Sequence, residues 1–270
     1  MAEAGARVSS SLQPTILITG ASSGLGAALA AAYAAPGIRL ALCGRNAERL
    51  FAVAESARAR GAGVASAAFD LRDTDALAAF VARVEETSPV GLAILNAGVL
   101  EGTSASGEPE DVAKMRAVIG VNLLAALEVF HAVAPGMRQR RSGQIVLISS
   151  IAALTPLPDA PAYSASKAGL LSYGLAMRDA LAPDGVIVTT ICPGYVTTPM
   201  TDSHAGPHPF EVPVDRAAAQ IQRLIARKGA VYGFPWPLYW GARLSQWLPS
   251  FVKGWASASL RFHVRDRRDA

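Results

Sequence analysis

The stretch that decides the fold of this chain is Thr19-Gly20-Ala21-Ser22-Ser23-Gly24-Leu25-Gly26. The β-branched run Thr15–Thr19 leads into it and predicts a short strand. The small residues Gly24–Ala35 follow and predict a helix, which Pro36-Gly37 ends. A strand, a glycine-rich turn and a helix in this order are typical of the first part of a βαβ unit, so the stretch predicts a parallel sheet.

The segments that follow alternate between the same two kinds of element. The predicted strands are Ile38–Cys43, Gly63–Phe69, Leu92–Leu95, Gln144–Ser149 and Val186–Ile191. The predicted helices are Ala47–Arg60, Thr74–Glu86, residues 109–119, residues 121–140 and Ala162–Leu181. Unbroken apolar runs such as Ile145–Ile148 are typical of strands with helices on both faces. We therefore expect a single α/β domain over residues 1–270, built on one doubly wound parallel sheet of the Rossmann type.

Composition fits one globular domain. Of 270 residues, 51% are hydrophobic and 17% charged, and the formal net charge is +4. This composition fills a large core, and the modest charge without a nucleic-acid motif argues against nucleic-acid binding. Cys43 and Cys192 each lie at the end of an apolar run, and we expect buried thiols in a reducing compartment. Met1–Pro14 lacks the apolar core of a signal peptide and no long apolar run follows, which predicts a cytoplasmic protein.

The glycine turn has the residues that a bound pyrophosphate requires. Gly20 permits a tight turn, Gly24 lets backbone amides approach the phosphates, and Gly26 lets the helix pack close to the sheet. The phosphates would lie at the positive N-terminus of the helix, together with Ser22, Ser23 and Leu25. A glycine turn without a ligand is the alternative interpretation.

The residues after the second predicted strand bear on the choice of nicotinamide cofactor. An NAD site usually has a carboxylate here, which binds the ribose 2′-hydroxyl. This chain has Cys43-Gly44-Arg45-Asn46 instead. The guanidinium of Arg45 can pair with a 2′-phosphate, so NADP(H) is favoured over NAD(H). A solvated Arg45 is the alternative.

Tyr163 and Lys167 lie one turn apart on a predicted helix, so they share one face. A nearby ammonium, together with the positive nicotinamide of an oxidised cofactor, favours the phenolate, and we expect both to lower the pKa of Tyr163 from its ordinary value of about 10. Tyr163 then becomes usable as a general acid/base. Ser150 follows a predicted strand and can donate a hydrogen bond to a substrate oxygen, with Ser149 as the competitor.

Taken together, these motifs resemble the short-chain dehydrogenase/reductase family over about residues 15–200. The order of the glycine turn, Asn122, Ser150, Tyr163 and Lys167 carries the resemblance. It implies hydride transfer between a nicotinamide and a carbonyl or alcohol carbon. In this interpretation Tyr163 is the acid/base, Lys167 also binds the ribose, Ser150 binds substrate and Asn122 holds a water of the proton relay. A catalytically silent NADP(H)-sensing or scaffold protein on the same fold is the alternative.

The resemblance assigns further cofactor contacts. Asp70, followed by Leu71, corresponds to the residue that bonds the adenine amine. Asn96-Ala97-Gly98 corresponds to the segment that lines the adenine ribose, although Asn96 could instead tie neighbouring strands together. The loop that holds the nicotinamide amide is matched by Pro193, Gly194, Val196 and Thr198. The resemblance also implies a homodimer or homotetramer.

The last part of the chain is unusual. We expect a substrate loop and helix over residues 201–229 and an aromatic-rich extension over residues 230–265, which holds all four tryptophans: Trp236, Trp240, Trp247 and Trp255. Three interpretations stay open: a core cap or subunit contact, a wall of an apolar substrate pocket, and a dock on a membrane surface. The last two favour a lipid-like or otherwise apolar substrate. His204 and His208 lack a neighbouring carboxylate or thiol cluster, so no metal site is expected.

Overall fold

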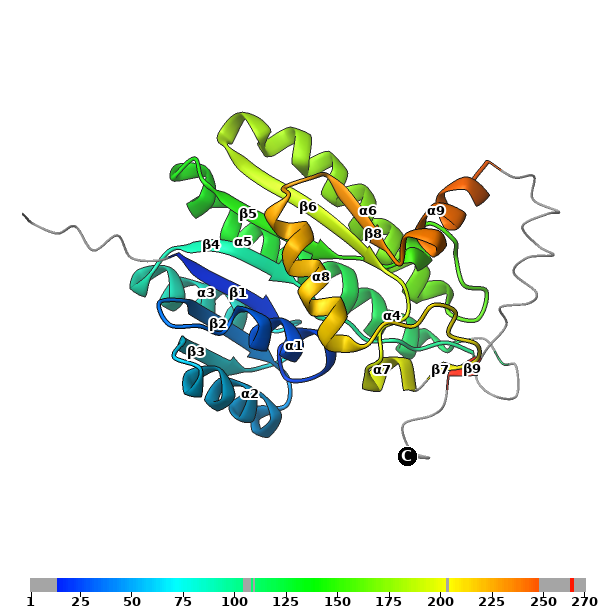
Figure 1. The fold of residues 1–270 in the computed structure, drawn as a ribbon, viewed down its shortest axis with the longest axis horizontal. Helices are drawn as coiled ribbons and strands as arrows, with labels where there is room; N and C mark the ends of the chain where they lie inside the picture. The colour runs from blue at the N-terminus through cyan, green and yellow to red at the C-terminus, as the bar shows by residue number, and fades with distance from the viewer. Residues whose placement is uncertain (1–13, 104–107, 109, 203, 248–262, 265–270) are drawn as a thin grey trace, which may run out of the picture.

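A seven-stranded sheet forms the centre of the computed structural model, which describes residues 14–103, 108, 110–202, 204–247 and 263–264 (Figure 1). Its order is β3-β2-β1-β4-β5-β6-β8, and every neighbouring pair is parallel. The strands are β1 (Thr15–Thr19), β2 (Arg39–Gly44), β3 (Gly63–Ala68), β4 (Val90–Leu95), β5 (Gly143–Ile148), β6 (Val186–Pro193) and β8 (Val231–Phe234). The predicted doubly wound parallel sheet is confirmed.

Helices cover both faces of this sheet (Figure 1). One face carries α1 (Gly24–Tyr33), α2 (Ala47–Ala59) and α8 (Val214–Ala226), whose Leu29, Leu50 and Ile221 share one buried apolar cluster with β1 and β2. The other face carries α3 (Thr74–Thr87), α5 (Ala125–Gln139) and α6 (Pro161–Leu181), whose Phe80, Phe130 and Leu170 belong to a second cluster. Short elements complete the described chain: α4 (Val112–Ile119), the π-helical turn η1 (Gly120–Leu124), the 3₁₀ turns η2 (Ile151–Ala153) and η3 (Ala182–Asp184), α7 (Pro199–Asp202), α9 (Trp236–Ser245), β7 (His204–Ala205) and β9 (His263–Val264).

The longest apolar helix, Val112–Gln139, joins α4, η1 and α5. It is long and apolar enough to cross a membrane by length and composition alone. However, Val129, Phe130 and Val133 are fully buried in the cluster beneath the sheet. This burial is typical of a core helix in a globular protein, which passes the same test of length and composition.

The aromatic-rich segment supplies part of the sheet itself. β8 pairs with β6 from Thr190 opposite Val231 to Pro193 opposite Phe234, and Phe234 is fully buried. This segment therefore begins as core and continues as α9. Trp255 lies outside the described residues. Cys43 and Cys192 are both buried free thiols, as predicted.

Candidate active site

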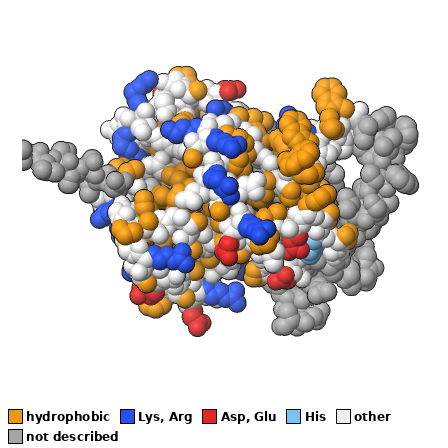
Figure 2. All heavy atoms as spheres, in the orientation of Figure 1, with side chains coloured by type: hydrophobic (Ala, Val, Ile, Leu, Met, Phe, Trp, Pro, Cys, Tyr) orange, Lys and Arg blue, Asp and Glu red, His pale blue; other side chains and the backbone are white. Residues whose placement is uncertain are grey.

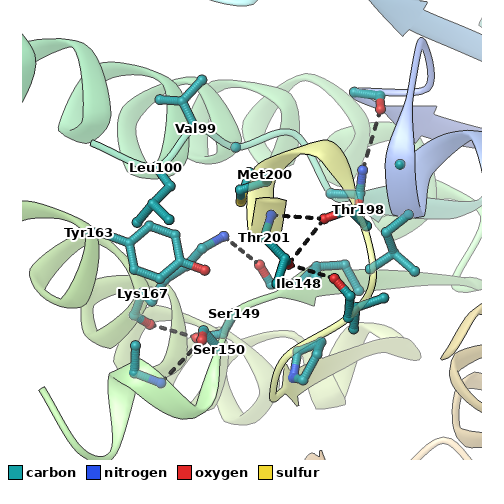
Figure 3. Close-up of a pocket in the computed structure, with 18 of the residues that line it drawn as sticks. Val99, Leu100, Ile148, Ser149, Ser150, Tyr163, Lys167, Thr198, Met200 and Thr201 are labelled. Carbon is teal, nitrogen blue, oxygen red and sulfur yellow. Dashed lines mark hydrogen bonds between the residues drawn. The ribbon is translucent and has the colours of Figure 1, made fainter. Parts of the chain in front are cut away.

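A cavity of about 930 Å³ lies at the carboxyl ends of the parallel strands. It extends from the turn between β1 and α1, past the ends of β2 to β6, to the inner side of α9. Figure 3 shows its central part, where side chains from β5, α6 and the segment around α7 converge. Ligands of doubly wound sheets bind at this edge, since the loops there leave a crevice.

The turn between β1 and α1 has room for a phosphate group. Gly20 has a φ of +66°, a left-handed conformation that glycine adopts without strain. A Cβ on Gly26 would overlap the carbonyl group of Gly20, so the helix packs this closely only because no side chain is present. The start of α1 lines the cavity through Ser22, Ser23, Gly24 and Leu25. Its free backbone amides can bind an anion.

Asn96 ties two strands together beside this turn. Its Nδ2 donates to the carbonyl oxygen of Thr19 over 3.1 Å, and its backbone amide donates to the Thr19 hydroxyl over 3.0 Å. The structural alternative for Asn96 is thus realised. The same segment, Asn96 to Gly98, also lines the cavity, so the two roles are compatible.

Two arginines line the cavity beyond the end of β2. Arg45 and Arg49 both line it, and Asn46 between them caps α2 by accepting a hydrogen bond from the Arg49 backbone amide over 2.8 Å. Arg49 was not predicted from the sequence; it lies in the first turn of α2, whereas Arg45 precedes the N-cap Asn46. Asp70 is held by Arg72 through a 2.6 Å ion pair, which lowers the pKa of the Asp70 carboxyl to about 2.

Ser150 and Tyr163 meet between the end of β5 and the start of α6 (Figure 3). The Ser150 hydroxyl acts to lower the pKa of Tyr163, and it accepts a hydrogen bond from the backbone amide of Ala152 over 3.1 Å. Ser149 is buried and donates instead to the carbonyl oxygen of Lys167 over 2.7 Å. Of the two candidate serines, Ser150 therefore lies beside the tyrosine.

Lys167 is buried behind Tyr163. Its Nζ donates to the carbonyl oxygen of Ile148 over 2.9 Å and lies 5.7 Å from the centroid of the Tyr163 ring. Burial lowers the pKa of Lys167 to about 8, and burial also raises the pKa of Tyr163, against the opposing hydrogen bond from Ser150. In the protein alone, burial thus shifts the pKa of Tyr163 in the direction opposite to the expected one, whereas the effect of the positive nicotinamide of a bound cofactor stays a prediction.

Asn122 lies in η1, where the helix widens between α4 and α5. Its Oδ1 accepts from the backbone amide of Val99 over 2.7 Å, and its Nδ2 donates to the carbonyl oxygen of Val99 and the hydroxyl of Ser166. Asn122 is fully buried and does not line the cavity. Its side chain therefore fixes the loop after β4 against α6, and only its main chain is left to hold a water.

The N-terminus of α6, which carries Tyr163, is capped from outside the helix. Ala160 at the N-cap offers no side-chain hydrogen bond, and Pro161 has no amide hydrogen. Glu110 supplies the missing acceptor: its Oε1 accepts from the backbone amide of Ala162 over 2.7 Å. Burial raises the pKa of Glu110, and Glu101 adds to this effect. No local signal in the sequence around Tyr163 could reveal this contact.

The remaining part of the cavity is mostly apolar, with Thr155 and Ser245 as polar members of its wall. Its wall is formed by Leu100, Leu157, Met200, Phe210, Leu238 and Ala242. Tyr195 closes one side and stacks on His208 with 5.1 Å between ring centroids. His208 also contacts Glu211 at 3.2 Å. Among the described residues no group of three potential metal ligands occurs.

Almost all predicted cofactor and catalytic residues line this one cavity. The exceptions are Gly26, which packs against the turn, and Asn122, which is buried behind it. The members that line it are Gly20, Ser22, Ser23, Gly24, Leu25, Arg45, Asp70, Leu71, Asn96, Ala97, Gly98, Ser150, Tyr163, Lys167, Pro193, Gly194, Val196 and Thr198. The structure thus brings distant sequence motifs to one place.

Known proteins are similar to this chain in sequence and in structure. An uncharacterised oxidoreductase of Myxococcus xanthus is 35% identical, over 92% of this chain and 97% of its own. A ketoacyl reductase, HetN, of a Nostoc species is 37% identical, over 68% of this chain and 63% of its own. A short-chain dehydrogenase from Sphingobium yanoikuyae, solved in complex with NADPH, has a TM-score of 0.76 and 27% identity over 95% of this chain and all of its own.

A variant of the actinorhodin polyketide ketoreductase, solved with NADPH, has a TM-score of 0.75 and 28% identity over 84% of this chain and 97% of its own. Because these relatives are oxidoreductases, a silent sensor or scaffold is not favoured. The family model for short chain dehydrogenases matches residues 14–207, the part of the chain that holds the glycine turn, Ser150, Tyr163 and Lys167. The chain therefore belongs to the short-chain dehydrogenase/reductase family and is an oxidoreductase that uses a nicotinamide cofactor.

Proposed function

We propose that this protein interconverts a carbonyl and a primary or secondary alcohol with NADP(H), and that its substrate is apolar. The observation that carries the proposal is the grouping of Ser150, Tyr163 and Lys167 at the carboxyl edge of the sheet, next to an apolar wall. The glycine turn, the start of α1 and the two arginines at the end of β2 fit the pyrophosphate and ribose of the cofactor. When bound, the cofactor supplies or accepts the hydride.

The side chains divide the remaining work. The Tyr163 hydroxyl donates a proton to the substrate oxygen during reduction and takes one back during oxidation. Ser150 holds that oxygen, since its hydroxyl lines the same cavity as Tyr163 and can donate to the oxygen that Tyr163 protonates. Lys167 is fixed by the carbonyl of Ile148, and its ammonium would bind the ribose of the cofactor. In reduction, a Tyr163 pKa that burial raises keeps the phenol protonated and ready to donate.

Preference for NADP(H) is supported by charge. Arg45 and Arg49 line the cavity where the adenosine end of the cofactor is expected, and the loop from Gly44 to Asn46 has no carboxylate. Each charge-assisted pair with a 2′-phosphate is worth about 1.5 to 3 kcal/mol, or roughly tenfold to a hundredfold in affinity. Arg45→Ala and Arg49→Ala should each weaken NADPH binding and leave NADH binding unchanged. Arg227→Ala, at the end of α8, is the control, and an unchanged NADPH/NADH ratio in both variants would contradict the preference.

An apolar substrate is supported by the residues around Leu100, Leu238 and Ala242. The Nostoc relative is a ketoacyl reductase and the actinorhodin relative is a polyketide ketoreductase, which supports reduction of a ketone. The test follows NADPH oxidation at 340 nm with ketones and aldehydes of increasing chain length. Turnover should rise with chain length and fall by about a hundredfold or more in Tyr163→Phe. Full activity in that variant would refute the role of Tyr163.

Three further points stay predictions. A water held by Asn122 would use its main chain, because Val99 and Ser166 occupy its side chain. A homodimer or homotetramer is expected from the family. A cytoplasmic location is expected from the sequence, with contact to a membrane surface as a separate question.

A further inference from the structure

Helix α9 has two faces with different surroundings. Leu238, Ala242 and Ser245 line the cavity. Trp236, Trp240 and Leu244 point away from it and are 72%, 54% and 64% exposed. Trp247, just beyond the helix, is 88% exposed. At about 100° per residue, positions 236, 240, 244 and 247 fall within an arc of about 80°, opposite the cavity-lining positions.

This outer stripe, defined by Trp236, Trp240, Leu244 and Trp247, is the most exposed apolar surface of the described chain. Trp247 and Trp236 are its two most exposed large apolar side chains. Figure 2 shows a group of apolar side chains over α9. A contiguous exposed apolar patch marks a surface that binds a partner.

The charge of the surrounding sequence indicates what kind of partner it is. Between residues 216 and 265 the chain has eight Lys and Arg and neither Asp nor Glu. Arg243 lies on α9 itself and is exposed. In a contact between two copies through this stripe, the Arg243 side chains of both copies would meet, which disfavours self-association. An anionic surface matches it.

Tryptophan together with cationic residues is suited to one such surface. Indole rings favour the headgroup region of a bilayer, and Lys and Arg are attracted to anionic lipids. An amphipathic helix with these residues lies in the plane of the interface. Since α9 separates the stripe from the cavity by the width of one helix, docking would place the apolar cavity wall next to the bilayer.

We propose that the outer stripe of α9 docks this protein on anionic lipid bilayers, so that an apolar carbonyl substrate passes from the bilayer into the cavity beside α9. The docking is independent of the reaction, whereas the passage of substrate rests on the proposed function. The two are therefore tested separately.

Intrinsic fluorescence of the full-length protein tests docking directly, because all four tryptophans lie between residues 236 and 255. Vesicles of equal parts phosphatidylcholine and phosphatidylglycerol should shift the emission to shorter wavelength and shield it from acrylamide. Vesicles of phosphatidylcholine alone should do so much less, and added salt should weaken the effect, since the attraction to anionic lipid is screened. No shift with the anionic vesicles would overturn the proposal, as would an equal shift with both.

Vesicle flotation of variants identifies the surface. Trp240→Ala with Leu244→Ala should lower the bound fraction by about tenfold or more, because two large apolar anchors are lost. Phe51→Ala is the matched control, since Phe51 is 64% exposed on α2. NADPH affinity and thermal midpoint should stay unchanged in the double variant, which shows that it is folded.

Undiminished flotation of the double variant, or an equal loss in Phe51→Ala, would assign docking elsewhere and overturn the proposal. A blue shift that grows with protein concentration without vesicles would instead assign the stripe to self-association. Turnover of soluble ketones is measured in parallel without lipid. Failure of the reductase assay therefore leaves the docking result intact, and failure of docking leaves the reductase assignment intact.

Discussion

The buried charge of Lys167 predicts how stability depends on pH. Lys167 is 4% exposed, and burial lowers its pKa to about 8 from the ordinary lysine value of 10.5. Below pH 8 the folded protein holds a buried ammonium, which destabilises it relative to the unfolded chain. Between pH 8 and 10.5 the folded state releases this proton while the unfolded state keeps it, so the unfolding free energy rises with pH in that window.

The size of the effect follows from these two values. Raising the pH from 7 to 9 should add about 1 kcal/mol to the unfolding free energy through Lys167 alone. Groups other than Lys167 also titrate, so the quantity to compare is the difference between the native protein and Lys167→Met, which keeps the length of the chain without its charge. Tyr163 does not interfere below pH 10, because its raised pKa lies above that value.

Urea denaturation of both proteins at pH 7, 8 and 9, without cofactor, provides the measurement. From pH 7 to pH 9, the unfolding free energy of the native protein should rise by about 1 kcal/mol more than that of Lys167→Met. A constant difference would mean that Lys167 titrates like an exposed lysine, and the account of its burial would be wrong. A difference that falls with pH would have the opposite sign and would require a paired anion at Nζ.

Three other substitutions test the supports of the site. Asn122→Leu should lower the unfolding free energy by about 3 kcal/mol, because it leaves the amide and the carbonyl of Val99 without partners. A loss below about 1 kcal/mol, measured by urea denaturation, would show that water replaces the side chain. Glu110→Ala should lower the unfolding free energy by about 1 kcal/mol and reduce kcat more than it changes KM. Glu110→Gln keeps an acceptor for the cap of α6 and should restore kcat. Equal kcat in both variants would show that Glu110 does not position the helix. Gly26→Ala should cost about 1 to 3 kcal/mol and weaken NADPH binding, since its Cβ overlaps Gly20; native affinity in a fluorescence titration would contradict the close packing of the turn.

The parts of the fold that were predictable depend on local patterns. The alternation of apolar runs and helical stretches identified β1 to β6 within a few residues, because period and turn residues are read from neighbours in sequence. β8 was missed. Val231–Phe234 is short and lies among aromatic residues, and only its pairing with β6 makes it a strand.

The site divides in the same way. The glycine turn and the spacing of Tyr163 and Lys167 lie on continuous segments, so the sequence places them directly. The choice between Ser149 and Ser150 was left open by strand geometry, since adjacent residues point to opposite sides and the register of β5 decides which one reaches Tyr163.

By itself, the sequence determined the family and the parallel sheet and predicted the catalytic residues, because each rests on residue types at fixed local spacing. Only the tertiary structure decided that Asn122 binds Val99, that Glu110 caps the helix of Tyr163 and that α9 has one face on the cavity and one in solvent. The first two contacts join segments that are far apart in the chain. The two faces of α9 differ because one packs on the cavity and the other meets solvent. Desolvation is likewise a property of the folded core, which is why the pKa of Tyr163 moved against the expectation from its neighbour Lys167.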